Sequence, residues 1–427
     1  MSNTDYENLI RTVDANFWMN QKLEGNDMKK AGGKTLELKI GKLFFITFIF
    51  FLLVTTPTEK QSPVDEPLQI DDATPVNSTP EAERITYAPE VSHRGGKALY
   101  SLEGDDYQKR IQINVTNNAN EALSAGYSVS FSLNTWYLTN QGDLQADGDD
   151  LRVAYNGTGF FNELDRVNVT AYNTYKTQIW FQTQSVIPAY SYDANYWIFY
   201  GNPSVSTPPN NPANIFLLFD DFNDGDYLGW NISSGSWTVS EYPASSGNKV
   251  VQGASSAYLY KEPETYGDVA ISARIRWEGG DRRRGVSTRF DQNGLYSYRL
   301  RMESSENGIE LRRLASSSSD LNTTSAFPSG VNYDAGNWYR YEIAAQTVNT
   351  NDVFVRGRIY DANMTLRCEL SDLDTSFFAL DADGKIALYG EGWFDDVIVR
   401  NFVNPEPTVE LISPRGIHLM LLTQDST

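Results

Sequence analysis

Two pairs of adjacent aspartates in this 427-residue chain have the residue types of a metal site. Asp220 and Asp221 lie near the start of a long stretch of alternating sequence, and Asp395 and Asp396 lie near its end. Carboxylates together with backbone carbonyls suit a hard cation such as Ca²⁺. We therefore predict a structural calcium site at these four residues, if the fold brings the pairs together. The alternative is that one aspartate of each pair caps a turn or meets an arginine, while the other is solvated.

Arginines form a second pattern, because eight of them alternate with apolar residues. They are Arg274, Arg276, Arg299, Arg301, Arg312, Arg340, Arg356 and Arg358. Neighbouring residues of a strand point to opposite faces, so these side chains are expected on outward faces. A guanidinium matches carboxylate or sulfate with two parallel hydrogen bonds, which would suit an anionic glycan. We favour cross-strand pairing with Glu310 and Glu342, which share this alternation.

Aromatic residues make up 13% of the chain, and exposed rings would be the signal of a sugar site. Four tryptophans lie beside or within the apolar positions and are predicted to be core: Trp230, Trp237, Trp277 and Trp393. Trp338, Tyr296 and Tyr360 are the better candidates for exposed rings. The candidate ligand-binding residues are Arg289, Tyr296, Arg299 and Trp338.

Composition excludes several classes of protein. With 55 acidic and 35 basic side chains the net charge is −20, which argues against a nucleic-acid binder, since such proteins need a basic surface. The chain has two histidines, His93 and His418, and a single cysteine, Cys368. This scarcity excludes a disulfide framework, a cysteine or histidine zinc site and nearly any histidine relay.

The N-terminal part predicts export. The apolar run at residues 43–54 follows several lysines and is shorter than the roughly 20 residues of a membrane-spanning helix. It therefore fits the core of a signal peptide or an uncleaved membrane anchor. Residues 1–42 are interpreted as a cytoplasmic segment or as an extension upstream of a later start at Met28. Residues 55–104, rich in proline and acidic side chains, predict a disordered linker. The expected location is secreted or anchored at the cell surface.

Residues 105–205 alternate with period two and predict a β-sandwich. The clearest strands are 111–115, 127–133, 177–181 and 196–200, separated by clusters of Gly, Asn and Asp. The segment resembles domain of unknown function 2341, a module of bacterial and archaeal surface proteins. The residues that carry this resemblance are Tyr107–Ile113, Ala146–Val153, Ile179–Phe181 and Tyr196–Pro203. The resemblance implies a fold and a surface context but no known activity.

Residues 214–402 alternate in the same way and resemble the concanavalin A-like lectin/glucanase (laminin-G-like) jelly roll. The resemblance rests on Asp220-Asp221-Phe222 near the first strand and Phe394-Asp395-Asp396-Val397 near the last. It implies that the first and last strands are neighbours, which would let the aspartate pairs approach one another. Residues 403–427 are interpreted as a C-terminal tail or the start of a truncated next module.

The predicted fold class is therefore all-β, with two tandem β-sandwiches after the apolar segment and the linker. The hydrolase branch of the jelly-roll group carries its acids on one strand as Glu-x-Asp-x-(x)-Glu, and the second module has no such string. We therefore favour a non-catalytic, carbohydrate-binding cell-surface protein of a prokaryote, with a glycan or surface polysaccharide as partner. The alternatives are a structural stalk or envelope-layer protein and an extracellular polysaccharide hydrolase.

Overall fold

The computed structural model describes residues 99–278, 283–302, 308–324, 335–412 and 418–419. Strands dominate this part of the chain, and its single α-helix is α3 (Thr135–Asn140), which begins where Asn134 accepts a hydrogen bond from the Tyr137 amide at 2.9 Å. The all-β prediction is confirmed for these residues. No helix among them is long and apolar enough to cross a membrane. The predicted signal or anchor at 43–54 and nearly all of the linker lie outside the described residues.

The first β module comprises residues 99–205 together with residues 408–412 and 418–419. Its larger sheet has six strands, in the order β26 (His418–Leu419), β25 (Thr408–Ile412), β3 (Lys109–Thr116), β9 (Tyr192–Tyr200), β5 (Arg152–Tyr155) and β6 (Asn162–Leu164). Its smaller sheet has three, in the order β4 (Ser128–Leu133), β8 (Thr177–Gln182) and β7 (Val167–Asn168). A separate hairpin joins β1 (Tyr100–Leu102) and β2 (Asp105–Tyr107).

Period-two alternation buries one face of each of these sheets. Ile113 and Val115 of β3 meet Ile179 and Phe181 of β8 in one hydrophobic core, and all four side chains are fully buried. The intervening residues of β4 and β8 point away from this core and carry polar groups or Trp180. The smaller sheet therefore presents a second, outer face to the rest of the molecule.

Strand β25 comes from the far end of the chain. Its residues pair antiparallel with β3, so that Val409 lies opposite Val115 and Leu411 opposite Ile113. Val409 and Leu411 are buried in the core of the first module. The segment interpreted as a tail or as the start of another module thus contributes an edge-side strand to the first module.

The second β module comprises residues 217–402 and contains two sheets. The eight-stranded sheet runs β12 (Trp237–Glu241), β13 (Lys249–Gly253), β24 (Gly392–Asn401), β15 (Val269–Arg276), β20 (Trp338–Asn349), β21 (Asp352–Tyr360) and β22 (Leu366–Asp374), and β10 (Leu218–Asp220) also pairs with β24. The seven-stranded sheet runs β11 (Trp230–Ser234), β14 (Tyr258–Lys261), β23 (Lys385–Gly390), β16 (Arg284–Asp291), β17 (Tyr296–Met302), β18 (Ile309–Leu314) and β19 (Ser319–Thr324).

One core joins the facing sides of these two sheets. Ile271 and Ile343 from the eight-stranded sheet and Leu300 and Leu388 from the seven-stranded sheet are fully buried in it. Three of the four tryptophans predicted to be core lie in it: Trp230, Trp237 and Trp277. Trp393 is the exception, because its neighbour Phe394 fills the core position while Trp393 lies partly exposed on the outer face. The prediction that Trp393 is core was wrong.

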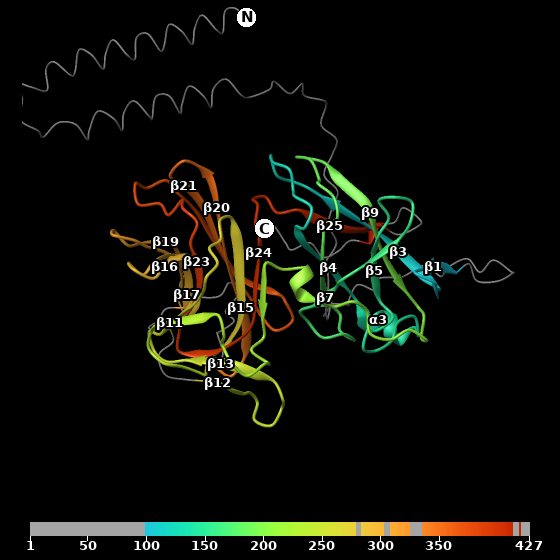
Figure 1. The fold of residues 1–427 in the computed structure, drawn as a ribbon, viewed down its shortest axis with the longest axis horizontal. Coiled ribbons are helices and arrows are strands. Elements are labelled where there is room, and N and C mark those ends of the chain that lie inside the picture. The colour runs from blue at the N-terminus through green and yellow to red at the C-terminus, as the bar shows by residue number, and fades with distance from the viewer. Residues whose placement is uncertain (1–98, 279–282, 303–307, 325–334, 413–417, 420–427) are drawn as a thin grey trace, which may run out of the picture. The chain divides into compact units, whose positions relative to one another are not determined.

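The two modules belong to one compact unit, residues 90–427. In Figure 1, β24 and β15 lie on the side of the second module that faces β4 and β7 of the first. The contact includes an apolar cluster in which Phe216 and Ile398 pack with Trp180. The Trp180 and Phe216 rings meet edge-on at 5.6 Å. The outer face of the eight-stranded sheet is therefore partly covered by the first module.

Candidate functional site on the outer face of the eight-stranded sheet

Cross-strand register arranges the outer face of the eight-stranded sheet in rows. At one end Gln252, Trp393, Arg276 and Trp338 are consecutive partners on β13, β24, β15 and β20. Further along the strands, one row runs across β15, β20 and β21 as Ser272, Glu342 and Arg358. The next row runs across β24, β15 and β20 as Arg400, Ala270 and Ala344. One face thus carries aromatic side chains at one end and charged side chains at the other.

We call Trp393, Arg276, Trp338 and the adjacent Tyr242 the aromatic row. The Tyr242 ring lies 5.1 Å from the Trp393 ring and 6.1 Å from the Trp338 ring, and the Arg276 guanidinium lies 4.7 Å from the centre of the Tyr242 ring. All four side chains are partly exposed. The row thus combines solvent-accessible ring surface with fixed hydrogen-bond donors, which is the composition of a small-molecule contact surface.

A pocket of about 160 Å³ adjoins the aromatic row. Its lining comprises Gln252, Trp277, Glu278, Glu391, Gly392 and Trp393. Tyr242 Oη donates a hydrogen bond to Glu278 Oε1 at 2.8 Å, and Arg276 also pairs with Glu278. The hydrogen bond from Tyr242 and the Arg276 guanidinium both lower the pKa of Glu278, so this carboxylate is ionised and accepts hydrogen bonds near neutral pH.

Beside the aromatic row, both aspartates of the second predicted pair contact one arginine. Arg274 Nη1 lies 2.9 Å from Asp396 Oδ2 and 3.7 Å from Asp395 Oδ2. Arg274 also lies over the Trp338 ring, at 4.8 Å. Burial and, next, the negative charge of Asp396 raise the pKa of Asp395 from 3.8 to about 6. The pairing of an aspartate with an arginine was the alternative given for this pair.

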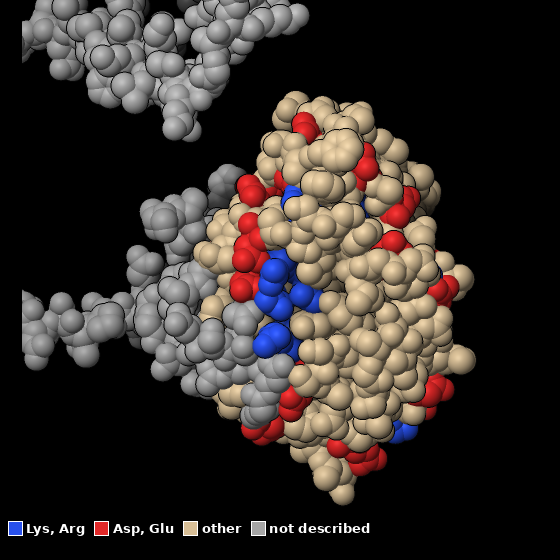
Figure 2. All heavy atoms as spheres, turned by 90° about the vertical axis from the view of Figure 1, so that its left-hand side faces the viewer, with Lys and Arg blue, Asp and Glu red and all other residues tan. Residues whose placement is uncertain are grey.

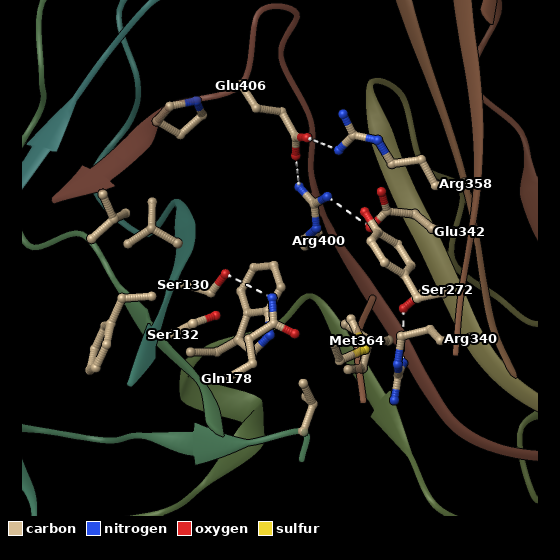
Figure 3. A pocket seen from close by; sticks show the side chains of 18 of the residues that line it. Ser130, Ser132, Gln178, Ser272, Arg340, Glu342, Arg358, Met364, Arg400 and Glu406 are labelled. Atoms are coloured by element: carbon tan, nitrogen blue, oxygen red, sulfur yellow. Dashed lines mark hydrogen bonds and ion pairs between the residues drawn. The ribbon is translucent and has the colours of Figure 1, made fainter. Parts of the chain in front are cut away.

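A larger cavity of about 520 Å³ lies between the modules (Figure 3). Ser130, Ser132 and Gln178 line it from the smaller sheet of the first module, and Arg340, Glu342 and Arg358 line it from β20 and β21 of the second. Gln178 Nε2 donates to Ser130 Oγ at 3.2 Å, and Arg340 Nη1 donates to Ser272 Oγ at 3.0 Å. Hydroxyl and amide groups therefore face guanidinium groups across this space.

Glu406 closes one side of this cavity and binds three arginines of the second module. Its carboxylate lies 2.6 Å from Arg400 Nη1 and 3.0 Å from Arg358 Nη1, and it also pairs with Arg356. Arg400 further pairs with Glu342 at 2.9 Å. Burial raises the pKa of Glu406, but Arg400, Arg356 and Arg358 outweigh burial and hold that pKa well below its usual range. Glu406 is therefore a carboxylate at any physiological pH.

Two of the predicted ligand-binding residues are buried. Arg289 donates to the Leu380 carbonyl at 2.6 Å and to Thr347 Oγ1 at 2.8 Å, and it pairs with Asp268 at 2.7 Å. Arg299 donates to Tyr258 Oη, and its guanidinium lies 3.9 Å from the centre of the Tyr389 ring. Burial lowers the pKa of both arginines. These side chains already have partners within the second module.

The other two predicted ligand-binding residues are partly exposed, on different sheets. Tyr296 lies on β17 and shares a hydrogen bond of 3.0 Å with Ser316. Trp338 belongs to the aromatic row of the other sheet. The structure therefore does not bring the four predicted residues together into one site.

The favoured cross-strand pairing with Glu310 and Glu342 is confirmed for Arg301 and Arg356, while Arg312 contacts Glu310 along the same strand and the other five arginines have other partners. Arg301 and Arg312 lie 2.7 Å and 3.4 Å from Glu310, and Arg356 lies 3.5 Å from Glu342. Figure 2, which views the side where β16, β17 and β19 lie in Figure 1, shows basic side chains gathered beside acidic ones. Opposite charges on neighbouring strands explain the alternation of arginine with apolar residues.

The first aspartate pair has different partners from the second. Strand β10 pairs with β24, so the first and last strands of this module are neighbours. Asp220 accepts hydrogen bonds from Trp230 Nε1 at 2.7 Å and from the Phe222 amide at 3.0 Å, and Asp221 accepts one from the Asn223 amide at 3.1 Å. Within the described residues no group of three or more His, Cys, Asp or Glu side chains is placed to hold a metal ion. The calcium site stays a prediction.

Sequence reasoning missed Tyr242 and Glu391, and it named Arg340, Arg356 and Arg358 without the first-module residues that face them across the cavity. For Trp393 a signal was present, because Trp393 and Phe394 are adjacent on one strand and only one of them can face the core. The assembly of the cavity gave no such signal, since its polar residues belong to two modules, with Gln178 on β8 of the first and Arg340 on β20 of the second.

Comparison with known proteins gives a partial family match. The model of a family described as Domain of unknown function (DUF2341) matches residues 147–240. This range starts later than the resemblance noted above, omits β3 and continues through β10 into β12 of the second module. A search of the curated proteins finds no match.

Several solved structures are similar to part of the chain. The carbohydrate-binding module CBM66 from Bacillus subtilis has 14% identity and a TM-score of 0.30, covering 40% of this chain and 96% of its own. The cellulose-induced protein Cip1 has 18% identity and a TM-score of 0.30, covering 43% and 97%. Domain 4 of AbnA, an extracellular arabinanase from Geobacillus stearothermophilus, has 11% identity and a TM-score of 0.30, covering 44% and 92%.

Proposed function

We propose that this chain is a non-catalytic carbohydrate-binding protein of the cell surface, and that the aromatic row is its sugar-contact surface. The observation that carries the proposal is the placement of Trp393, Arg276 and Trp338 as neighbours on three adjacent strands, with Tyr242 packed against both indoles. The C–H face of a pyranose ring is apolar while its rim carries hydroxyls. Partly exposed rings beside charged donors and acceptors match both features.

The carboxylates near the row support binding rather than cleavage. Glycoside hydrolysis needs one carboxyl group with a raised pKa to protonate the leaving oxygen. Glu278 has a lowered pKa and is held by Tyr242 and Arg276. Glu278 therefore suits a fixed acceptor for sugar hydroxyls. Asp395 has a raised pKa, but its side chain is only 1% exposed, so it is not placed to protonate a sugar bound on the row.

The wider proposal follows the sequence analysis. The second module is a concanavalin A-like jelly roll that binds the glycan, and the first module is a spacer or co-binding module. The segment at 43–54 directs export or anchors the chain to a membrane, and the acidic linker holds the modules away from that surface. Competing structural roles, as a stalk or envelope-layer protein, predict self-assembly without glycan affinity.

Binding of the full chain to insoluble cellulose, xylan and chitin tests the proposal. We expect retention on at least one of them, and we expect Trp393→Ala and Trp338→Ala each to weaken that retention about tenfold, because each removes a stacking ring. Tyr296→Ala removes a partly exposed ring from the other sheet and is the matched control; it should leave retention unchanged.

Two outcomes would overturn this function. One is retention that neither tryptophan substitution reduces. The other is release of reducing sugar from a retained polysaccharide, since this would show that the surface cuts its ligand.

A further inference from the structure

The cavity between the modules has the size and the lining of a ligand site. Its volume of about 520 Å³ lies in the usual range for small-molecule pockets, roughly 300–1,000 Å³. Figure 3 shows Ser130, Ser132 and Gln178 on one side and Arg340, Arg358 and Arg400 on the other. None of its lining residues belongs to the aromatic row, so the inference below is independent of the proposed function.

The lining carries an excess of positive charge in a chain of net charge −20. Five basic side chains line it (Lys176, Arg340, Arg356, Arg358 and Arg400) against three acidic ones (Glu342, Glu369 and Glu406). The three glutamates are shared among Arg356, Arg358 and Arg400. The excess of two positive charges therefore belongs to Lys176 and Arg340.

Those two cations lack a carboxylate partner within the lining. Lys176 Nζ donates to the Met364 carbonyl at 2.8 Å, and burial lowers the Lys176 pKa. Arg340 is 6% exposed, and its nearest carboxylate in the described structure is Asp396, outside the lining at 3.9 Å. Lys176 is half-buried, and the counter-ion of the buried Arg340 lies at the long distance of 3.9 Å, so an anion in the cavity would offset part of the cost of burying these cations.

Several polar atoms of the lining also make no hydrogen bond to any other described residue. They are Tyr127 Oη, Gln178 Oε1, Trp180 Nε1, Arg340 Nη2 and Arg356 Nε. Buried polar atoms are nearly always paired, with protein, water or ligand. These atoms are covered in this structure, so the groups open to a ligand are the cations of one wall and the hydroxyl and amide groups of the other.

We propose that the cavity binds an acidic sugar, that is, a hydroxylated ring that carries a carboxylate. The carboxylate supplies the charge that Lys176 and Arg340 lack, and a guanidinium can bind it with two parallel hydrogen bonds. The ring hydroxyls match the hydroxyls of Ser130 and Ser132 and the amide of Gln178, which line the opposite wall.

Calorimetric titration of the full chain with D-glucuronate tests the proposal, with D-glucose and sulfate as comparison probes. We expect glucuronate to bind at least about tenfold more tightly than either probe, because only glucuronate combines the charge with hydroxyls. The affinity should fall as salt is raised. Glucuronate should also change the fluorescence of Trp180, and this change should disappear in Trp180→Phe.

Two substitutions place the ligand in the cavity. Arg340→Gln should weaken glucuronate binding about tenfold or more by removing a cation that has no carboxylate partner in the lining. Gln178→Glu, on a partly exposed position of the opposite wall, should weaken it to a similar extent by adding a negative charge, and it preserves the size of the side chain. Arg312→Gln makes the same charge change on the other sheet and should leave the affinity unchanged.

The proposal is overturned if glucose binds as tightly as glucuronate, or if sulfate does so, since the latter marks an unspecific anion site. It is also overturned if folded Gln178→Glu binds glucuronate as the unmodified chain does. Loss of polysaccharide retention in the Trp393→Ala variant with glucuronate binding intact would separate this site from the aromatic row.

Discussion

Asp395 and Asp396 are consecutive on one strand, yet both carboxylates contact Arg274. Regular alternation would send them to opposite faces of the sheet. The register between β24 and β15 shifts here, since Arg274 pairs with Asp395 and Ser272 pairs with Ile398. Asp396 is the extra residue of this bulge and has φ of 46°. The bulge brings Asp395, 1% exposed at its side chain, beside a second negative charge.

The raised pKa of Asp395 predicts a pH-dependent stability. The stabilisation from its neutral form is complete below about pH 3.8 and is lost as pH rises through about 6. Asparagine stays neutral at every pH, so Asp395→Asn should not lose this stabilisation. We therefore expect the free energy of unfolding of the variant, relative to that of the unmodified chain, to rise by about 2–3 kcal/mol from pH 4 to pH 8, since each pKa unit corresponds to about 1.4 kcal/mol. Urea unfolding at several pH values measures this difference. If the free energy of unfolding changed with pH in the same way in both proteins, the prediction would be contradicted.

At the scale of elements, β25 makes the first module discontinuous in sequence. Its alternation places Val409 and Leu411 in the core of that module, while Thr408 and Glu410 are exposed. Without β25, the edge of β3 would lack its antiparallel partner and the core would lose two aliphatic side chains. A strand from the C-terminal end of the described chain is thus needed to complete a sheet that begins near residue 109.

Leu411→Ala should therefore destabilise the first module, although it lies beyond the second module in sequence. We expect a loss of about 2–5 kcal/mol, the usual range for removing a buried leucine side chain. Hydrogen exchange of the β3 amides should accelerate in this variant. Glu410→Ala, on the opposite face of the same strand, is the control and should leave that exchange unchanged.

At the scale of the whole described unit, Glu406 links the modules electrostatically. It follows β24 of the second module and precedes β25 of the first, and its carboxylate pairs with Arg356, Arg358 and Arg400. The Asn118 amide donates to its backbone carbonyl at 2.8 Å. One residue thus contacts both modules, and its ion pairs lie at one side of the cavity between them (Figure 3).

Glu406→Gln should loosen this connection. Because it leaves three guanidiniums without their shared carboxylate, we expect a loss of about 3 kcal/mol and a calorimetric transition that separates into two. The lowered pKa means that the stabilisation is present above the unfolded-state pKa of about 4.5 and is lost only when the pH falls well below that value. The deficit of the variant should therefore persist at pH 5.

Glu369→Gln provides the matched control. Among the described residues Glu369 forms an ion pair with Arg358 alone, and its side chain is 39% exposed, so its loss should cost less than about 1 kcal/mol. Equal effects of the two substitutions would contradict a special role for Glu406.

The positions of the strands, and the face of the sheet on which each side chain lies, could be predicted well, because they depend on local period-two patterning. The alternation at 269–277 and 353–359 matches β15 and β21, with Ile271 and Val355 in the core and Arg274 and Arg356 on the outer face. The prediction weakened wherever a residue's environment depends on more than its own strand. Arg289 and Arg299 have outward or irregular positions, yet other parts of the chain bury them.

By itself, the sequence determined the fold class, the strands and part of the arginine–glutamate pairing, since alternation and charge act between near neighbours. Only the tertiary structure decided which strands are adjacent. The adjacency of β24, β15 and β20 forms the aromatic row, and the pairing of β25 with β3 places β25 in the first module. The same tertiary structure encloses a cavity between residues that are far apart in the chain. The physical reason is that burial and cross-strand contact depend on distances in space, and spacing along a chain does not fix those distances.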